Sequence, residues 1–375
     1  DLPIRPELAR VSAYGAPQLD VPVRLNTNEN PHAPSDEVVA AIVASIATEV
    51  SGLQRYPDRD ALLLRGDLAA YVTSATGVDV GTDNVWAANG SNEVLQQLLQ
   101  TFGGPGRTAL GFEPSYSMHA LISRGTGTLF TSVPRDANFA IDVAAACDAI
   151  DRVKPSVVFV CSPNNPTGTA VDLDVINRLY EQLLATDTGV LIVDEAYAEF
   201  SKRPSAITLL PGRQRLIVTR TMSKAFAFAG ARVGYFVGDP AVVEAVMRVR
   251  LPYHLSAITQ AAARGALAHS TQLLAAVDDL KFQRDRIVVG CRELGLLVAD
   301  SDANFVLFGG FTDQAAIWRK LLEAGVLVRD VGLPGWLRVT AGTPDETSAF
   351  LSALTTIAQE PGVVTTATAV GQEST

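Results

Sequence analysis

Three short apolar runs, each ending in polar residues, constrain the fold of this chain more than any other feature. They cover residues 156–162 (SVVFVCS), 190–194 (VLIVD) and 216–219 (LIVT). A continuous apolar run of this length is typical of a strand covered on both faces. An amphipathic helical pattern at residues 173–184 separates the first two runs. Strands that alternate with helices predict an α/β fold with a mostly parallel central sheet flanked by helices.

Further elements are expected toward the N-terminus. Residues from Asp36 onward have helical periodicity, and Ser35 supplies a start signal for that helix. The stretch at residues 85–93 predicts a short strand that runs through a glycine into a helix over residues 94–102. The polar side chain of Ser91 or of Asn92 can cap the helix over residues 94–102.

The C-terminal part of the chain has a different pattern. Residues 256–291 are rich in alanine and predict one or two long helices. Residues 292–358 predict a smaller α+β unit, with strands near 304–308, 326–329 and 336–340 and helices between them.

The length of 375 residues is sufficient for a full core and predicts two domains. We expect an N-terminal arm over residues 1–35 that packs with the small domain, because its Pro, Asn and Asp content cannot build a core. The large domain is expected at 36–270 and the small C-terminal domain at 271–358. Residues 359–375 lack periodicity, so we expect a disordered tail.

Composition excludes several classes of function. The net charge of −10 argues against nucleic acid as a partner, because phosphate backbones select basic surfaces. No apolar run approaches the ~20 residues that a membrane helix needs, and no signal-peptide pattern is found, so we expect no membrane partner. Three cysteines without a CxxC pair disfavour a disulfide framework and a metal site, and they fit a cytoplasmic protein.

Lys224 is the candidate catalytic residue, because it comes five residues after the end of the apolar run at 216–219. A buried ammonium is costly and tends to lose its proton, which is what an amine nucleophile requires. The alternative is a surface lysine with its charge in water. Two hydroxyl groups, of Thr221 and Ser223, and a second cation, Arg232, lie close to Lys224 in the sequence. These groups are suited to binding a phosphate.

Polar residues end the predicted strands in chain order: Gly90-Ser91-Asn92, Asn165, Asp194 with Tyr197, and Ser223-Lys224 with Arg232. Asp194 follows Asn165 by 29 residues and Lys224 follows Asp194 by 30, which is room for one crossover helix and one strand. Ligands bind at the C-terminal ends of such strands. The predicted pocket contains an amine, a carboxylate, an amide and a phosphate site, which matches the needs of pyridoxal 5'-phosphate.

Three motifs carry a family resemblance, namely Ser162-Pro-Asn-Asn-Pro-Thr-Gly168, Asp194-Glu-Ala-Tyr197 and Ser223-Lys224 with Arg232. In this order and spacing they resemble the fold-type I pyridoxal-phosphate enzymes of the aspartate aminotransferase superfamily. Further blocks resemble the histidinol-phosphate aminotransferases, in particular those of actinobacteria: Leu25-Asn-Thr-Asn-Glu-Asn-Pro31, Arg55-Tyr-Pro-Asp58, Asn89-Gly-Ser-Asn-Glu93, Asp302-Ala-Asn-Phe305 and Leu337-Arg-Val-Thr340.

The resemblance implies a role in cofactor binding for each strand-end residue. Lys224 would bind the aldehyde covalently and move the proton at the substrate's Cα, and Asp194 would keep the pyridine nitrogen protonated. Donors to the phenolate oxygen would be Asn165 and Tyr197. The phosphate would be bound by Ser91, Asn92, Thr221, Ser223 and Arg232. Tyr116 would stack on the pyridine ring. Ordinary structural roles remain alternatives: a turn for Asn165, a helix cap for Asp194 and core packing for Tyr116.

The resemblance also implies substrate contacts and a homodimer. Tyr56 corresponds to a tyrosine that reaches the phosphate in the neighbouring subunit. Arg338, helped by Arg329, would bind the acidic end of the substrate, and Asn30 and Tyr253 would line the imidazole side. Position 30 varies within the family, which leaves imidazole recognition open.

The predicted reaction is transamination from L-histidinol phosphate to 2-oxoglutarate. Relatives on the same scaffold accept phenyl in place of imidazole rings, so an aromatic amino-acid aminotransferase is the nearest alternative. A decarboxylase of phosphorylated amino acids is another. A regulator built on this fold would need a DNA-binding helix-turn-helix and a basic patch, which the acidic composition disfavours.

Overall fold

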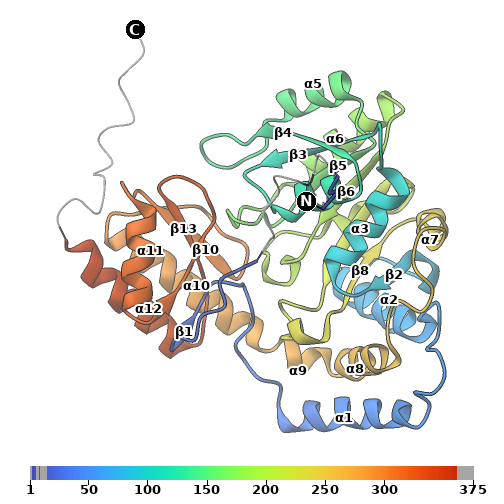
Figure 1. The fold of residues 1–375 in the computed structure, drawn as a ribbon, viewed down its shortest axis with the longest axis horizontal. Helices are drawn as coiled ribbons and strands as arrows, with labels where there is room; N and C mark the ends of the chain where they lie inside the picture. Colours follow the sequence, from blue (N-terminus) through green and yellow to red (C-terminus); the bar gives the residue numbers. More distant parts are fainter. Residues whose placement is uncertain (1, 6–7, 9–14, 361–375) are drawn as a thin grey trace.

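The computed structural model describes residues 2–5, 8 and 15–360. A seven-stranded sheet forms the larger part and a four-stranded sheet the smaller part (Figure 1). The larger sheet has the order β2-β8-β7-β6-β5-β3-β4. Its strands are β2 (Val85–Ala88), β3 (Thr108–Glu113), β4 (Leu129–Pro134), β5 (Val157–Cys161), β6 (Val190–Asp194), β7 (Leu216–Thr221) and β8 (Gly234–Val237).

Five neighbouring strands of this sheet, β3 to β7, run parallel. Strand β8 runs antiparallel to both of its neighbours, β2 and β7. The predicted α/β fold with a mostly parallel sheet is therefore confirmed. Register places Cys161 beside Asp194 and Asp194 beside Thr219, so the C-terminal ends of the central strands lie at one edge of the sheet.

Helices cover both faces of the larger sheet. They are α2 (Leu62–Thr76), α3 (Ser91–Phe102), α4 (Met118–Gly125), α5 (Val143–Val153), α6 (Leu173–Ala185), α7 (Pro240–Met247) and α8 (Ala257–Leu267). Helix α1 (Asp36–Val50) packs on the outside of α8 (Figure 1). Alternate residues of a strand point to opposite faces. Val158 and Val160 of β5 accordingly pack in the cluster that includes α2, α5, α6 and α8, whereas Val157 and Phe159 pack in the cluster that includes α3 and α7.

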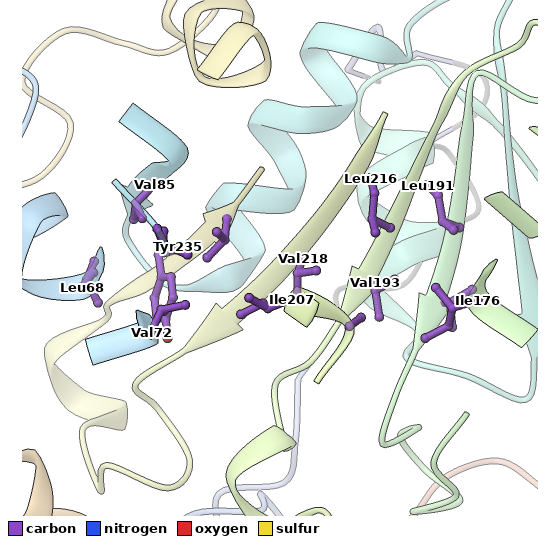
Figure 2. Packing of buried hydrophobic residues seen from close by; sticks show 14 of the residues in the cluster. Leu68, Val72, Val85, Ile176, Leu191, Val193, Ile207, Leu216, Val218 and Tyr235 are labelled. Atoms are coloured by element: carbon purple, nitrogen blue, oxygen red, sulfur yellow. The ribbon is translucent and has the colours of Figure 1, made fainter. Parts of the chain in front are cut away.

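Figure 2 shows the first of these clusters, in which Val193 and Val218 of neighbouring strands lie next to Ile207. Leu68 and Val72 of α2 extend the cluster toward Tyr235 of β8. Full burial of an aliphatic side chain contributes about 1.5–3 kcal/mol. These rows of fully buried side chains therefore fix the sheet against its helices and hold the strand ends in place.

Two expectations about helices are wrong. Gly90 occupies the N-cap position of α3 without a side-chain hydrogen bond, so neither Ser91 nor Asn92 caps the helix. The Asn92 carboxamide instead accepts a hydrogen bond from Tyr116. The predicted start of α1 is confirmed, because the Ser35 hydroxyl accepts from the amide of Val38.

The second wrong expectation concerns the alanine-rich region after residue 256. It forms three helices, not one or two: α8, α9 (Ser270–Leu274) and α10 (Ala276–Glu293). The chain leaves helical geometry at His269, whose φ is −119°, and this separates α8 from α9.

The smaller unit combines a four-stranded antiparallel sheet with helices (Figure 1). Its sheet order is β12-β13-β10-β9. The elements are β9 (Leu297–Val298), β10 (Phe305–Gly309), α11 (Gln314–Glu323), β11 (Val326–Leu327), β12 (Arg329–Asp330), β13 (Trp336–Thr340) and α12 (Pro344–Ala358). The N-terminal segment joins this unit, because β1 (Val23–Arg24) pairs in parallel with β11 and Leu25 packs in its hydrophobic cluster. The domain boundaries stay a prediction, and the tail expected to be disordered lies outside the described residues from 361 onward.

Candidate active site

A cavity opens at the C-terminal ends of β5, β6 and β7. Residues of the N-terminal segment, of the start of α3 and of the smaller unit complete its walls. The lining consists of Ala16, Asn26, Thr27, Asn28, Ser91, Asn92, Tyr116, Cys161, Asn165, Asp194, Ala196, Tyr197, Thr221, Ser223, Lys224, Arg232, Arg329 and Arg338. The structure thus brings together the predicted site residues except Tyr56, Asn30 and Tyr253.

Lys224 follows β7 by three residues, and its amine lies at the wall of the cavity. The Nζ atom donates a hydrogen bond to the backbone carbonyl of Thr27 at 2.9 Å. Burial, together with the nearby cations of Arg338 and Arg232, lowers the pKa of Lys224 to about 8, while the carboxylate of Glu29 opposes this shift. A substantial fraction of the amine is therefore neutral near pH 8, as a nucleophile or a base requires.

Asp194 ends β6 and is almost fully buried. Both of its carboxylate oxygens have partners: Oδ2 lies 3.0 Å from Nε2 of His119, and Oδ1 accepts from the Thr219 hydroxyl at 3.1 Å. The His119 ring stacks on Phe159 with 4.5 Å between centroids. These contacts hold the carboxylate in one orientation. Sequence reasoning missed His119, whose only signal is its position three residues after Tyr116.

Asn165 and Arg338 form a direct link between the larger and the smaller unit. Arg338, on β13, donates from Nη1 to Oδ1 of Asn165 and from Nη2 to the carbonyl of Asn26, both at 2.7 Å. Its guanidinium also lies 5.2 Å from the ring centroid of Phe305. The acceptor oxygen of Asn165 is occupied by this contact, so its amide nitrogen is the group that can donate within the cavity.

Tyr197 is buried beside the same cavity. Its hydroxyl oxygen accepts a hydrogen bond from Nδ2 of Asn28 at 3.0 Å. Burial raises the pKa of Tyr197 above its ordinary value, so the phenol keeps its proton and can donate it. Asn28 belongs to the same block of residues, 25–31, as Asn30, which the sequence analysis selected instead.

The start of α3 and Arg232 form a site with the properties of an anion cradle. Gly90 has φ of +81°, and a Cβ atom there would lie 2.3 Å from Nη2 of Arg232. Arg232 donates to the Ser223 hydroxyl at 3.2 Å, and the Thr221 hydroxyl donates to Ser223 at 3.0 Å. A helix N-terminus, hydroxyls and a guanidinium converge here, and this is the combination that binds phosphate.

Tyr116 also lies where the sequence predicts it, at the cavity wall. Its hydroxyl donates to Oδ1 of Asn92 at 3.1 Å, and its ring meets that of His119 edge-on at 5.5 Å. Arg329 lines the cavity and donates to the carbonyl of Gly15 at 3.4 Å.

Three predicted residues lie outside the cavity of the single chain. The side chain of Tyr56 is 79% exposed and stacks on Tyr253 with 4.3 Å between ring centroids. Asn30 donates to the carbonyl of Ala225 at 3.1 Å. The roles of these residues stay predictions.

The chemistry of the cavity fits pyridoxal phosphate. It offers an amine of lowered pKa, a fixed carboxylate, two neutral donors in Asn165 and Tyr197, and an anion cradle that a side chain at Gly90 would fill. Among the described residues, no group of three or more His, Cys, Asp or Glu side chains could hold a metal ion. Within the same residues, no helix is long and apolar enough to span a bilayer.

Comparison with known proteins gives close relatives over nearly the whole chain. The histidinol-phosphate aminotransferase of Frankia casuarinae is 61% identical over 355 residues, which are 94% of this chain and 89% of that protein. That of Mycolicibacterium smegmatis is 57% identical over 94% of this chain and 93% of its own length. A solved histidinol-phosphate aminotransferase from Sinorhizobium meliloti, in complex with pyridoxal-5'-phosphate, has the same fold. It has a TM-score of 0.80 at 24% identity and covers 90% of this chain and 91% of that one.

The fold and the site together define a pyridoxal-phosphate-dependent transferase of fold type I. Residues 21–354 match the family described as aminotransferase class I and II. The chain belongs to this family, and the predictions of an aminotransferase and of its cofactor are confirmed.

Proposed function

We propose that the protein transfers the amino group of L-histidinol phosphate to 2-oxoglutarate, giving imidazole acetol phosphate and L-glutamate in histidine biosynthesis. The observation that carries this proposal is the position of Arg338 in the cavity, hydrogen-bonded to Asn165 and partnered by Arg329 in the lining. The names of the relatives that are 61% and 57% identical support it.

The same cationic site must serve two different substrates in this reaction. Histidinol phosphate has a phosphate and no carboxylate, whereas glutamate has a side-chain carboxylate. A planar guanidinium binds both groups through paired hydrogen bonds. Arg338 therefore binds the acidic end of each substrate, and Arg329 adds positive charge to the same wall.

Pyridoxal phosphate, when bound, supplies an aldehyde for the substrate's amine and a ring system that accepts electrons. Lys224 would hold the cofactor through Nζ and would then accept and return the proton at the substrate's Cα. Its lowered pKa, caused first by burial, allows Nζ to accept this proton near neutral pH.

The remaining cavity residues would bind and orient the cofactor. Asp194, fixed by His119 and Thr219, would bind the pyridine nitrogen. Asn165 and Tyr197 would donate to the phenolate oxygen, and Tyr116 would pack against the ring. The phosphate would be bound at the cradle of cavity-lining residues Ser91, Asn92, Thr221, Ser223 and Arg232.

We further propose that the active unit is a homodimer in the cytoplasm. Tyr56 is strongly exposed, and further exposed apolar side chains lie on α1 and in loops: Val39, Val43, Val50, Leu53 and Leu251. Apolar surface of this extent is typical of an interface. In the dimer, Tyr56 of one subunit binds the phosphate in the other. The free cysteines suit a reducing compartment. Light scattering tests the dimer, and a monomeric mass at micromolar concentration would refute it.

Steady-state kinetics tests the reaction. With L-histidinol phosphate and 2-oxoglutarate varied together, we expect the parallel double-reciprocal lines of two separate half-reactions, with imidazole acetol phosphate as the product. L-Phenylalanine as the alternative donor is the control, because the cationic wall also accepts a carboxylate. A higher kcat/KM for phenylalanine would reassign the protein as an aromatic amino-acid aminotransferase.

A further inference from the structure

The N-terminal segment contributes a buried asparagine to the floor of the active site. Asn28 is 1% exposed and has φ of +56°, a backbone conformation that asparagine adopts more readily than most residues. Its neighbours Asn26 and Thr27 contact the site through backbone carbonyls, which accept from Arg338 and Lys224. Asn28 is the residue of this segment whose side chain reaches Tyr197.

The contacts of Asn28 fix the orientation of its carboxamide. The Asn28 amide N–H donates to Oγ1 of Thr340, and the Thr340 hydroxyl donates to Oδ1 of Asn28, both at 3.0 Å. A threonine hydroxyl has one proton, and here that proton is used on Oδ1. The other end of the carboxamide, Nδ2, is thereby directed to the hydroxyl of Tyr197 at 3.0 Å. Asn304 supports the arrangement by donating to the Asn28 carbonyl at 3.2 Å.

This orientation determines what Tyr197 can do. A phenol hydroxyl has one proton to donate and also accepts. Because Nδ2 of Asn28 can only donate, Tyr197 is the acceptor in this pair and keeps its own proton for a group in the cavity. We propose that Asn28 is a positioning residue, which directs the Tyr197 hydroxyl to donate a hydrogen bond to the bound cofactor. This inference rests on the proposed function, in which the Tyr197 acceptor is the phenolate oxygen of pyridoxal phosphate.

The alternative is that Asn28 only anchors the N-terminal segment, and three variants separate the two roles. Asn28→Asp keeps the size and tolerates the positive φ, but it presents a carboxylate oxygen to Tyr197. The tyrosine then donates to this new carboxylate, and its proton is turned away from the cavity. Asn28→Gly removes the side chain without adding charge and also allows the positive φ. Tyr197→Phe removes the hydroxyl itself.

The readout is the pH midpoint of the visible absorption of the cofactor-loaded protein without substrate. A hydrogen bond to the phenolate oxygen disfavours a proton on the adjacent lysine-linked nitrogen, so its loss raises the midpoint. We expect Asn28→Asp and Asn28→Gly to raise it by about one pH unit, the size of one hydrogen bond to a charged group. In the Tyr197→Phe background, Asn28→Gly should not shift the midpoint further. Asn28→Asp should shift it less than in the presence of Tyr197, because only the effect of its added charge remains.

An unchanged midpoint in both single variants, or an equal shift in the Tyr197→Phe background, would overturn the inference and leave the proposed function intact. If both Asn28 variants fail to fold, Thr340→Val provides the test, because it removes the hydroxyl that orients the carboxamide. An unchanged midpoint in that variant would likewise overturn the inference. A wild-type protein that gains no visible absorption with pyridoxal phosphate would refute the proposed function itself, and the inference with it.

Discussion

Gly90→Ala tests the anion cradle by moving one guanidinium. The added Cβ would lie 2.3 Å from Nη2 of Arg232 and 3.0 Å from its Cζ, whereas ordinary contact begins near 3.4 Å. The guanidinium must therefore move by about 1 Å, which is easy for the end of a flexible side chain but removes it from its place beside Ser223. A hydrogen bond to a charged group contributes about 1.5–3 kcal/mol. At 1.4 kcal/mol per factor of ten, the dissociation constant of pyridoxal phosphate should rise about 10- to 100-fold.

The backbone effect of this substitution needs its own control. Gly90 has φ of +81° and ψ of +163°, a conformation essentially restricted to glycine, so alanine there costs roughly 1–3 kcal/mol, offset in part by about 0.4–1 kcal/mol from the lower entropy of the unfolded chain. Gly106→Ala is the control for a positive-φ glycine without a neighbour, because Gly106 has φ of +79° and open space where its Cβ would lie. Both variants should lose thermal stability.

The assay is a titration of each apo-protein with pyridoxal phosphate, followed by protein fluorescence. Only Gly90→Ala should weaken binding. If Gly90→Ala binds the cofactor as tightly as the wild type, or if Gly106→Ala weakens binding equally, the cradle is not built as described.

Three further predictions concern the lysine, the arginine and the subunit interface. In the apo-protein, the rate of covalent cofactor attachment should rise with pH and level off above about 8. The reason is that burial, followed by Arg338, lowers the pKa of Lys224 from its ordinary value, and only the neutral amine reacts. Lys224→Ala should show no attachment at any pH, and a wild-type rate that does not change with pH would contradict the assignment of Lys224. Arg338→Gln should raise KM for both L-histidinol phosphate and glutamate by about 10- to 100-fold, because a charged hydrogen-bond donor is lost. It should also move the pH midpoint of cofactor attachment at Lys224 to higher pH. A rise in KM confined to glutamate would mean that the phosphate binds elsewhere. Tyr56→Phe should weaken cofactor binding about 10- to 100-fold, the value of one hydrogen bond to a charged group. The thermal midpoint of the apo-protein should stay unchanged because Tyr56 is 79% exposed. An unchanged affinity would remove Tyr56 from the phosphate site.

Much of the sheet could be predicted because its strands are marked locally. Buried runs such as 190–194 are apolar throughout, and the carboxylate that ends this one has to lie at the sheet's edge. The antiparallel strand β8 lacks such a signal, since only four residues pair with its neighbours. The break at His269 was also not predicted, because the alanine-rich sequence around it favours helix.

The parts of the site that sequence reasoning missed depend on long-range contacts. Asn28 and Asn30 are chemically identical and two residues apart, but only Asn28 meets Thr340, which is 312 residues away along the chain. The positive φ at Asn28 and the pairing of β1 with β11 determine this meeting, and neither is marked in the sequence. His119 likewise acquires its role through Asp194, 75 residues away.

The most direct test of the central claim is a single half-reaction. Holo-protein is mixed with L-histidinol phosphate in the absence of any keto acid, and the visible absorption of the lysine-bound cofactor is followed by stopped flow, with L-phenylalanine in a parallel experiment. We predict rapid loss of the band with L-histidinol phosphate, with one imidazole acetol phosphate formed per Lys224 site, and a much slower loss with phenylalanine. Faster loss with phenylalanine, or an unchanged band with L-histidinol phosphate, would contradict the assignment of this cavity to histidinol phosphate.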